Sequence, residues 1–441
     1  MGTHKAHGNP TKDFFVYTIT KDVAIEDCIL DLLDNAIDGA QKIISKKNPQ
    51  ITRIDDYSGY SANLILDSAN FSIKDNCGGI SISEAIDYAF HFGRRTDAPS
   101  DGPYSIGLYG IGMKRAIFKL GQEILIYSST STEAFKAKIN VHDWLAKGPD
   151  DWDFDLEDAE PATIPGTQIS ISTLTSTAAS TFGLSAFRSS LARIIGRDYF
   201  QFLKKGFHIS IGGSEVPAYA FNIRENAEFK PAHITYDDGD VTVEIVAGMA
   251  STPPDDLEPS ESLPETDYFG WFVLCNDRVV LPSDKSVKTI WGNDGFPVWH
   301  PQYNGFLGMV SFHSRDAKLL PWTTTKRDLD QTSPVFRRAV VKMKEATRSW
   351  LAYTNDRRID LDQAKAHEAQ APSRAIFEAT ASAKATFPGS AVATKPTATI
   401  NYRKLLDEVK LVKAALGNAN MSNRDVGLKT FDYYLRNEVG E

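Results

Sequence analysis

The stretch Ile29-Leu-Asp-Leu-Leu-Asp-Asn-Ala-Ile-Asp-Gly39 decides the fold of the N-terminal part of the chain. Its apolar residues recur every three or four positions, which predicts one amphipathic helix with a buried face. Its polar side chains are Asp31, Asp34, Asn35 and Asp38, and residues three or four apart on a helix share a face. A carboxylate that orients water, beside an amide oxygen that ligates Mg²⁺, suits a nucleotide-phosphate site. A solvated acidic face is the alternative.

The composition is that of an ordinary globular protein. The chain has 441 residues, which is long enough for two or three domains. Of these residues, 42% are hydrophobic and 24% are charged. A net charge of −9 gives no overall attraction to nucleic acid or to an anionic membrane, although a local basic patch is still allowed. Three widely spaced cysteines and a start without an apolar run predict a cytoplasmic protein. No segment reaches the ~20 apolar residues of a spanning helix, so no membrane partner is expected.

A strand followed by a glycine turn comes after the predicted helix. Asn70-Phe-Ser-Ile-Lys-Asp75 alternates between polar and apolar residues, which predicts a strand that ends in Asp75. Gly78 and Gly79 then predict a tight turn. Such a turn exposes a carboxylate at a strand end and lets the backbone approach a ligand closely, whereas an ordinary hairpin turn is the alternative.

A second glycine-rich segment, Gly107-Leu-Tyr-Gly-Ile-Gly-Met-Lys114, precedes a helical pattern. Backbone N–H groups, the helix dipole and a lysine together favour phosphate at such a place. The spacing is not that of the dinucleotide-binding glycine motif. It is not a Walker A loop either, because Met113 precedes the lysine and Arg115 stands in place of Ser or Thr. A flexible hinge before the helix is the alternative.

After residue 175 the pattern changes to that of a second α/β domain. A helix with one basic side is predicted over 183–205. Strand patterns follow it at 208–211, 241–247, 268–274 and 305–313. The segment Cys275-Asn-Asp-Arg-Val-Val280 is expected to turn between two strands. Lys326 lies on a Thr-rich loop before a helix, where it either reaches toward another site or is surface charge beside a helix cap.

The C-terminal part is predicted to be less regular. An amphipathic helix is expected at 333–353. Residues 371–400 have the Ala/Ser/Thr/Pro composition of a linker, with a partly helical stretch at 374–384. Two helical patterns follow at 402–416 and 422–437, and such a pair is more often a packing or dimerisation element than a DNA reader.

In their order and spacing, the motifs resemble those of the GHKL ATPases, the superfamily of gyrase B, heat-shock protein 90, histidine kinases and MutL. The motifs are the acidic helix, Asp75-x-x-Gly78-Gly79, Gly107-x-x-Gly110-x-Gly112-x-Lys114 and Gly166-Thr167. MORC-like and related bacterial ATP-binding proteins are the most similar group, since they share the core of Tyr109-Gly-Ile-Gly-Met-Lys114. The resemblance implies an α+β fold. It places an ATP-binding α/β sandwich (the Bergerat fold) at 1–175 and a ribosomal-protein-like transducer domain at 176–345, followed at 346–441 by a helix, a linker and a helical pair.

The resemblance also implies roles for individual residues. Asn35 would ligate the Mg²⁺ that bridges the triphosphate of ATP, and Asp31 would act catalytically by polarising the attacking water. Asp75 would accept the adenine amino proton with support from Thr167, and Lys326 would reach the γ-phosphate as a second catalytic residue. Further ATP contacts are implied for Asp38, Gly79, Gly107, Tyr109, Gly110, Ile111, Gly112, Met113 and Lys114.

Two departures from the family pattern bear on activity. Asp31 stands where most of the superfamily has a glutamate, which is one methylene longer, so slow hydrolysis is expected. Cys77 replaces the first glycine of the usual DxGxG motif, which indicates that the backbone there needs no positive φ.

The resemblance therefore predicts a Mg-ATP-binding ATPase. Lid closure over about 93–112 and nucleotide-dependent homodimerisation would drive a clamp, with nucleic acid as a partner in genome maintenance or phage defence. The alternative is a nucleotide-gated scaffold that hydrolyses little ATP and recruits a protein partner through its tail at 400–441. A histidine kinase would need a dimerisation helix with a phosphoacceptor histidine before the ATP domain, and a heat-shock chaperone would need longer later domains, so both are less favoured.

Overall fold

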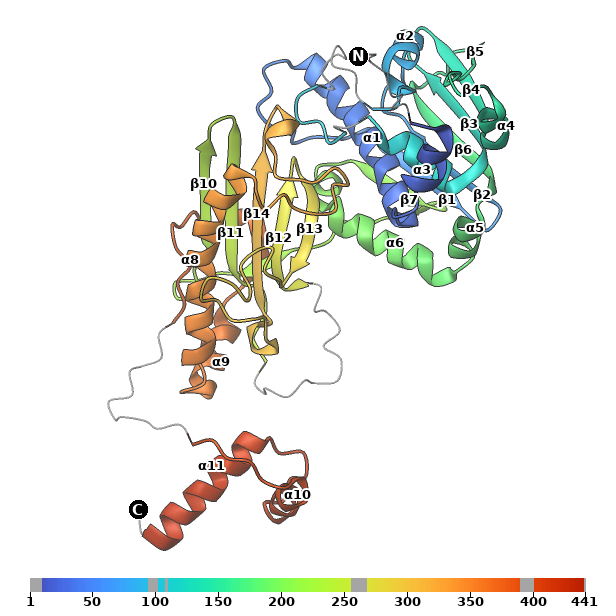
Figure 1. Cartoon of the computed structure of the whole chain (residues 1–441). Helices are drawn as coiled ribbons and strands as arrows, with labels where there is room; N and C mark the ends of the chain where they lie inside the picture. Colours follow the sequence, from blue (N-terminus) through green and yellow to red (C-terminus); the bar gives the residue numbers. More distant parts are fainter. Residues whose placement is uncertain (1–9, 94–101, 108–109, 255–267, 389–399, 440–441) are drawn as a thin grey trace, which may run out of the picture.

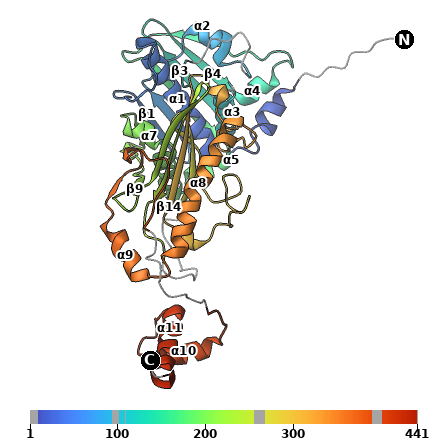
Figure 2. The ribbon, with the colours of Figure 1, turned by 90° about the vertical axis from the view of Figure 1, so that its left-hand side faces the viewer.

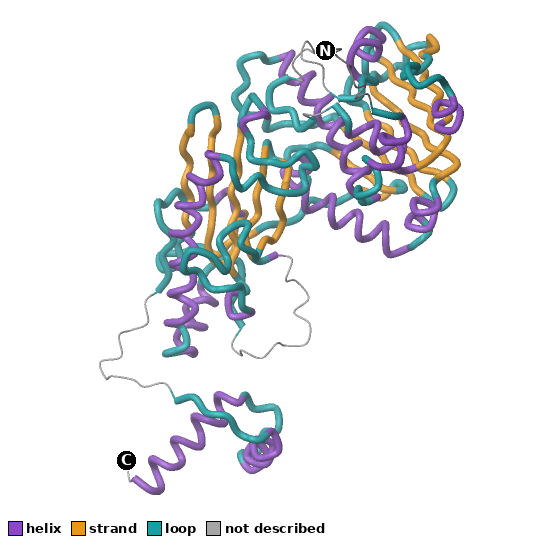
Figure 3. Tube along the Cα trace, in the orientation of Figure 1, coloured by secondary structure: helices purple, strands orange, loops and turns teal. Residues whose placement is uncertain are grey.

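The computed structural model describes residues 10–93, 102–107, 110–254, 268–388 and 400–439. Two β-sheets, each with helices packed on it, form its two main parts, and a pair of helices follows them (Figure 1). Figure 3 shows how most of the strands gather into these two sheets, with the longest helices beside them. None of the helices within the described ranges combines the length and the apolar character needed to cross a lipid bilayer.

Helix α1, Ile25–Lys47, confirms the amphipathic helix predicted around residues 29–39. Its apolar face is fully buried, with Ile29, Leu33 and Ile37 at 0% exposure. Acidic residues occupy its first turn and two lysines its last turn, an arrangement that complements the helix dipole. The helix is therefore anchored by its apolar face, which leaves its polar face for other contacts.

The N-terminal sheet has eight strands in the order β5-β4-β3-β6-β2-β1-β7-β8. Their bounds are β1 Ser61–Leu66, β2 Asn70–Asp75, β3 Gly121–Ser129, β4 Ala134–Asn140, β5 Leu156–Ala159, β6 Gly166–Leu174, β7 His208–Ile211 and β8 Ser214–Glu215. Neighbouring strands are antiparallel except β1 and β7, which are parallel. A mixed sheet of this kind, covered by helices, fits the expected α+β class.

The sheet does not end at residue 175. Strands β7 and β8 extend it beyond the point where a second domain was expected to begin. The connection to them contains α5 Ser176–Phe182, α6 Ser185–Asp198 and α7 Phe200–Lys204, where one helix over 183–205 was predicted. Tyr199 divides α6 from α7 because its backbone leaves the helical region, with φ −114° and ψ 16°. The domain bounds stay predictions, but the first sheet includes residues up to 215.

The remaining helices of the N-terminal part are short. They are the π-helix η1 Phe14–Thr18, α2 Ile82–Glu84, the π-helix η2 Ala85–Ala89, α3 Gly112–Leu120 and α4 Val141–Ala146. Helix α3 begins within the glycine-rich segment and packs against α1, as the sequence pattern predicted for a helix after Gly112. Its N-terminus is thereby brought beside the polar face of α1.

The second sheet has five strands in the order β10-β11-β14-β12-β13. Their bounds are β10 Ala232–Asp238, β11 Val241–Met249, β12 Gly270–Cys275, β13 Arg278–Asp284 and β14 Phe306–His313. Asn276 and Asp277 have positive φ values of 46° and 67°, which confirms the predicted turn between β12 and β13. Helix α8, Pro334–Asp356, lies along this sheet, as Figure 2 shows, and confirms the helix predicted at 333–353.

The linker predicted at 371–400 is wrong for its first half. Strand β15, Ser373–Ala375, pairs with β9, Asn222–Arg224, and the 3-10 helix η6, Ile376–Glu378, follows where a helical stretch was expected. The small-residue composition conceals a few large apolar anchors: Ile376 is fully buried, and the Phe387 ring stacks on Tyr353 at 5.1 Å between centroids. Residues 389–399 lie outside the described part of the chain.

The other elements of the second half are also short or terminal. They are η4 Pro301–Tyr303, η5 Ala317–Leu319, α9 Leu361–Gln370, α10 Leu406–Ala415, α11 Asn423–Tyr434 and the π-helix η7 Leu435–Val439. Helices α10 and α11 confirm the two C-terminal helical patterns. Ser422 caps α11 by accepting the backbone N–H of Asp425 at 3.1 Å.

Candidate active site

A cavity of about 430 Å³ lies between α1, the turn after β2 and the N-terminus of α3. This volume is within the range of small-molecule sites. The predicted site residues that line it are Asp31, Asn35, Asp38, Asp75, Gly79, Gly107, Gly110, Ile111, Gly112, Met113, Lys114, Thr167 and Lys326. Tyr109, the remaining predicted site residue, lies outside the described residues. The structure therefore brings together every predicted site residue that it describes, while their individual roles stay predictions.

Helix α1 runs along the cavity and connects its two ends. Gly39 lies against the turn after β2, because a Cβ on it would stand 2.6 Å from the carbonyl oxygen of Cys77. Eight residues earlier, Asp31 lies against the start of α3, since a Cβ on Gly112 would stand 3.2 Å from its Cγ. At 1.5 Å per residue these points are about 12 Å apart along α1. We call them the Asp75 end and the Asp31 end of the cavity.

At the Asp75 end, backbone N–H groups hold the carboxylate that terminates β2. Oδ1 of Asp75 accepts the N–H of Cys77 at 2.8 Å and that of Thr167 at 3.2 Å. Burial raises the pKa of Asp75 to about 6, although these two hydrogen bonds act in the opposite direction. Among the described residues Oδ2 has no hydrogen-bond donor, so it is available to a ligand.

Close backbone packing explains the glycines at this end. Gly79 has a φ of +67°, and a Cβ on it would lie 2.1 Å from the carbonyl oxygen of Ser129. A Cβ on Gly166 would lie 2.2 Å from the carbonyl oxygen of Asp75. Both glycines therefore allow β2, β3 and β6 to end side by side, a role that comes in addition to any approach to a ligand. Cys77 is not among the residues with positive φ, which confirms that this position does not require glycine.

Ser128 is a residue at this end that the motifs did not reveal. Its Oγ accepts the backbone N–H of Ile80 at 2.7 Å and lies 2.9 Å from Oγ1 of Thr167. Ser128 is fully buried in β3, so it fixes the hydroxyl of Thr167 at the cavity wall. A lone serine in a strand gives no sequence signal for this role.

In the middle of the cavity, Asp38 and Asn35 differ in their surroundings. Asp38 accepts the backbone N–H groups of Ile106 at 2.6 Å and Gly107 at 2.5 Å, and burial raises its pKa to about 7. Its carboxylate therefore positions the glycine-rich segment. Asn35 is exposed toward the cavity.

The metal-binding capacity of the site rests on Asn35. No group of three His, Cys, Asp or Glu residues in the described ranges is arranged to hold a metal ion. Mg²⁺ is commonly bound by one or two protein oxygens together with substrate phosphates and water. The amide oxygen of Asn35 fits such a partial ligand set.

At the Asp31 end, a buried arginine holds the carboxylate. Nη2 of Arg115, on α3, donates to Oδ2 of Asp31 at 2.5 Å, and both side chains are buried. Burial raises the pKa of Asp31, while the nearby charges of Lys326 and Arg115 lower it. The sequence pattern drew attention to Arg115 only as a departure from a Walker A loop, so this contact was not foreseen.

Lys114 and Lys326 bring two further cations to the cavity wall. Nζ of Lys114 donates to the carbonyl oxygen of Ala89 at 2.8 Å, and burial lowers the pKa of Lys114 to about 7. Lys326 comes from the loop beyond β14 and has a positive φ of 55°. Its Nζ lies 3.0 Å from Oδ2 of Asp34. The cavity thus receives a lysine from each of the two main parts of the molecule.

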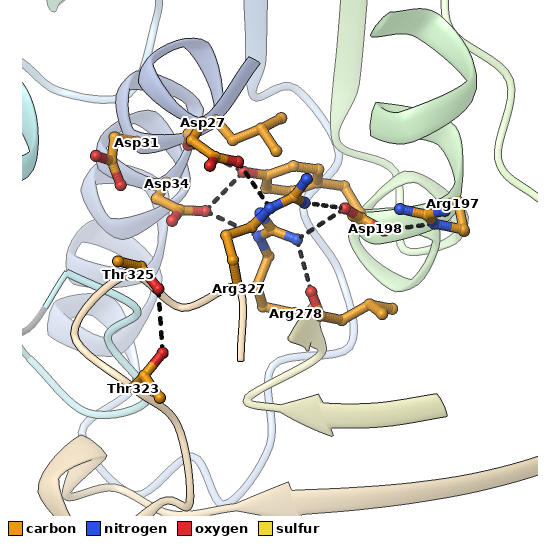
Figure 4. Close-up of polar contacts among 12 residues, drawn as sticks. Asp27, Asp31, Asp34, Arg197, Asp198, Arg278, Thr323, Thr325 and Arg327 are labelled. Atoms are coloured by element: carbon orange, nitrogen blue, oxygen red, sulfur yellow. Dashed lines mark hydrogen bonds and ion pairs between the residues drawn. The ribbon is translucent and has the colours of Figure 1, made fainter. Parts of the chain in front are cut away.

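Asp34 is the centre of a buried ion network between these two parts (Figure 4). Besides Lys326, it accepts the hydroxyl of Tyr199 at 2.7 Å and Nε of Arg278 at 3.2 Å. Burial opposes its ionisation, but Lys326 and Arg278 hold the pKa of Asp34 below its usual value. Arg278 also lies 3.6 Å from Asp198 on α6.

Arg327 extends the network. It pairs with Asp198 at 2.6 Å and with Asp27 at 2.8 Å, as Figure 4 shows. Adjacent residues of one loop therefore face different places: Lys326 faces the cavity, and Arg327 binds α1 and α6. The loop beyond β14 is fixed to the N-terminal part by charge.

The comparison with known sequences agrees with this geometry. The sequence family described as histidine kinase-, DNA gyrase B-, and HSP90-like ATPase matches residues 23–167. Residues 23–167 form a GHKL-like ATPase domain. Such domains bind Mg-ATP, and this one contains every residue lining the cavity except Ile169, Thr324 and Lys326. The matched span begins just before α1 and ends in β6, so β7 and β8 complete the sheet of the GHKL-like domain from outside it. Among curated proteins, none matches the chain.

Proposed function

We propose that this protein is an ATPase whose GHKL-like domain binds Mg-ATP in the cavity and works together with Lys326. The observation that carries the proposal is the contact of Lys326 with Asp34 on the polar face of α1, at one end of the cavity. The two residues are 292 positions apart in the chain. The donor set supports the ligand: Lys114, Arg115 and Lys326 offer positive charge, and the N-terminus of α3 favours phosphate.

In this proposal the nucleotide lies along α1. Asp75 accepts the amino group of adenine and Thr167 supports it, while the phosphates extend toward the Asp31 end. Asn35 offers its amide oxygen to Mg²⁺, which supplies charge neutralisation to the phosphates when bound. Lys114, Lys326 and the backbone of Gly107, Gly110 and Gly112 stabilise negative charge on the phosphate oxygens.

Asp31 has the catalytic role in the same proposal. Its carboxylate orients the attacking water and accepts its proton, and the water oxygen forms a bond to the terminal phosphorus as the bond to ADP breaks. Aspartate is one methylene shorter than the glutamate of most relatives, so turnover is expected to be slow.

The proposal has a finer part that rests on the resemblance to MORC-like and MutL-like proteins. ATP binding would close the phosphate lid, favour a homodimer and drive a clamp, with nucleic acid as a partner in genome maintenance or phage defence. The ion network around Asp34 supports coupling between nucleotide and the transducer-like part, because it joins α1, α6 and β13. Sizing with and without a non-hydrolysable ATP analogue tests dimerisation, and a salt-dependent DNA shift assay tests the nucleic-acid partner.

A nucleotide-gated scaffold with little hydrolysis is the second candidate. Two observations favour it: Arg115 holds Asp31, and the described tail, 400–439, exposes ten large hydrophobic side chains. Examples are Leu405, Leu411 and Tyr433. An exposed set of this size suits capture of a protein partner.

The direct test compares nucleotide binding and phosphate release in wild type and Asn35→Ala, with Asn70→Ala as the control. Both asparagines are exposed, but Asn70 lies outside the cavity lining. We expect Asn35→Ala to abolish Mg²⁺-dependent release and Asn70→Ala to leave it unchanged. Tight binding without release above background would favour the scaffold. Absence of both binding and release in wild type would contradict the proposed function.

A further inference from the structure

Arg115 is a buried cation that the four sequence motifs leave without a role. It is the fourth residue of α3, is only 8% exposed, and lines the cavity at the Asp31 end. Its Nη2 donates to Asp31, whereas its buried Nε has no hydrogen-bond partner in the described part of the chain. A guanidinium carries five N–H donors, so Arg115 keeps capacity for a second acceptor.

A second buried ion pair, between a carboxylate of α1 and a cation from elsewhere in the chain, lies at the same end of the cavity. Lys326 reaches Asp34, three residues after Asp31 on α1, so the two carboxylates are neighbours on the helix. Arg115 and Lys326 both line the cavity. Asp31 and Asp34 therefore each bind a cation that also lines the cavity, Arg115 and Lys326 respectively.

The position of Arg115 favours the last phosphate of a bound nucleotide. It contacts Asp31, about 12 Å along α1 from the turn beside Asp75. A guanidinium binds phosphate oxygens through two parallel N–H donors, and a terminal phosphate carries more negative charge than a carboxylate. A triphosphate at this end would therefore compete with Asp31 for Arg115, and a diphosphate would lack the competing group.

We propose that Arg115 binds the terminal phosphate of ATP and that Asp31 is the acceptor which this phosphate displaces. The inference rests on the proposed function, because it requires ATP to extend from Asp75 toward Asp31. Arg115 thereby distinguishes ATP from ADP. Asp31 is released for work on water only when a terminal phosphate has taken its partner, so the carboxylate stays engaged while ADP is bound.

Binding measurements test the role of Arg115 without relying on turnover. Calorimetry with Mg²⁺ compares a non-hydrolysable ATP analogue with ADP. We expect Arg115→Met to weaken binding of the analogue by about ten- to a hundredfold, which is the size of one lost charge-assisted contact. Binding of ADP should weaken by less than about threefold. Arg115→Lys should recover part of the loss, because it keeps the charge without the paired donors. Lys119→Met is the matched control, since Lys119 is on the same helix but contacts the carbonyl of Lys21 outside the cavity.

The competition itself is tested by removing the charge of Asp31. Asp31→Asn leaves Arg115 with a weaker acceptor, so the analogue should bind several-fold more tightly while ADP binding stays unchanged. The gain should vanish when Asp31→Asn is made in the Arg115→Met background. This double variant also removes the uncompensated buried carboxylate that could unfold the single variant Arg115→Met.

The outcomes separate the inference from the proposed function. If wild type binds neither nucleotide, the proposed function fails. If wild type binds the ATP analogue and ADP, and Arg115→Met weakens binding of the two nucleotides equally, then Arg115 is structural. In that case the inference fails while the proposed function stands. A gain from Asp31→Asn that persists without Arg115 would likewise overturn the competition.

Discussion

The two ends of the cavity hold their carboxylates in different ways. At the Asp75 end, backbone N–H groups of Cys77 and Thr167 hold Asp75, and glycines pack against neighbouring backbone. At the Asp31 end, cationic side chains hold Asp31 and Asp34. Backbone donors stay in place whatever anion enters, whereas side-chain cations can exchange one anion for another. In the proposed function, the Asp75 end would recognise the base of the nucleotide and the Asp31 end would respond to its phosphates.

The largest effect on stability is expected from a substitution that breaks the ion network at the Asp31 end. Asp34→Ala leaves Lys326 and Arg278 buried without their carboxylate, so we expect a loss of about 3–5 kcal/mol in the free energy of unfolding. Denaturant titration measures it. The control is Glu157→Ala, whose pair with Lys138 is exposed and contributes about 0–1 kcal/mol. Equal losses in the two variants would contradict the importance of the buried network.

The next effect tests the steric precision of the Asp75 end. Gly79→Ala places a Cβ against the carbonyl of Ser129 at a positive φ, so we expect a loss of about 3 kcal/mol in stability and weaker nucleotide binding. Gly59→Ala separates the two causes, because Gly59 also has positive φ, at +90°, but a Cβ there meets nothing within 4 Å. It should lose about 1–2 kcal/mol. If Gly59→Ala costs as much as Gly79→Ala, the backbone contact is unimportant.

The smallest effect is an opposite response of the two ends to acid. Burial raises the folded-state pKa of Asp75 to about 6 from a usual 3.8, so its ionisation opposes folding. Asp75→Asn should therefore add about 1–3 kcal/mol at neutral pH, a gain that fades as the pH falls from 6 to 4. Asp34 has a lowered pKa, so its contribution is complete above pH 4 and is lost at lower pH. Denaturant unfolding of wild type, Asp75→Asn and Asp34→Ala across pH 3–8 measures both contributions to stability. If the two variants differ from wild type by amounts that change with pH in the same way, the difference between the ends is contradicted.

The Asp75 end was largely predictable from sequence because its signals are local. A strand pattern ending in Asp75, followed by Gly78 and Gly79, sets a turn whose backbone geometry few residue types allow. Likewise, the spacing of the apolar residues in α1 predicted that its polar side chains share one face of the helix. These features depend on residues within a few positions of one another.

The Asp31 end was less predictable because its partners are remote in the chain. Arg115 is 84 residues from Asp31, while Tyr199 and Arg278 are 165 and 244 residues from Asp34. No local pattern selects one arginine from the many in the sequence, so these pairs emerged only with the fold. Composition also misled at 371–388, where a few aromatic and aliphatic side chains outweigh many small residues.

The parallel pairing of β1 with β7 has a consequence for dissecting the protein. A fragment that stops at residue 167 would lose β7, one of the two partners of β1, and expose the N–H and C=O groups of Ser61–Leu64 along an open sheet edge. It would also uncover the core ring of Phe71, which stacks on Phe182 at 5.8 Å between centroids. Such an edge is a template for aggregation, so we expect a fragment of residues 23–167 alone to aggregate. A fragment intended to stay monodisperse should continue at least through Glu215.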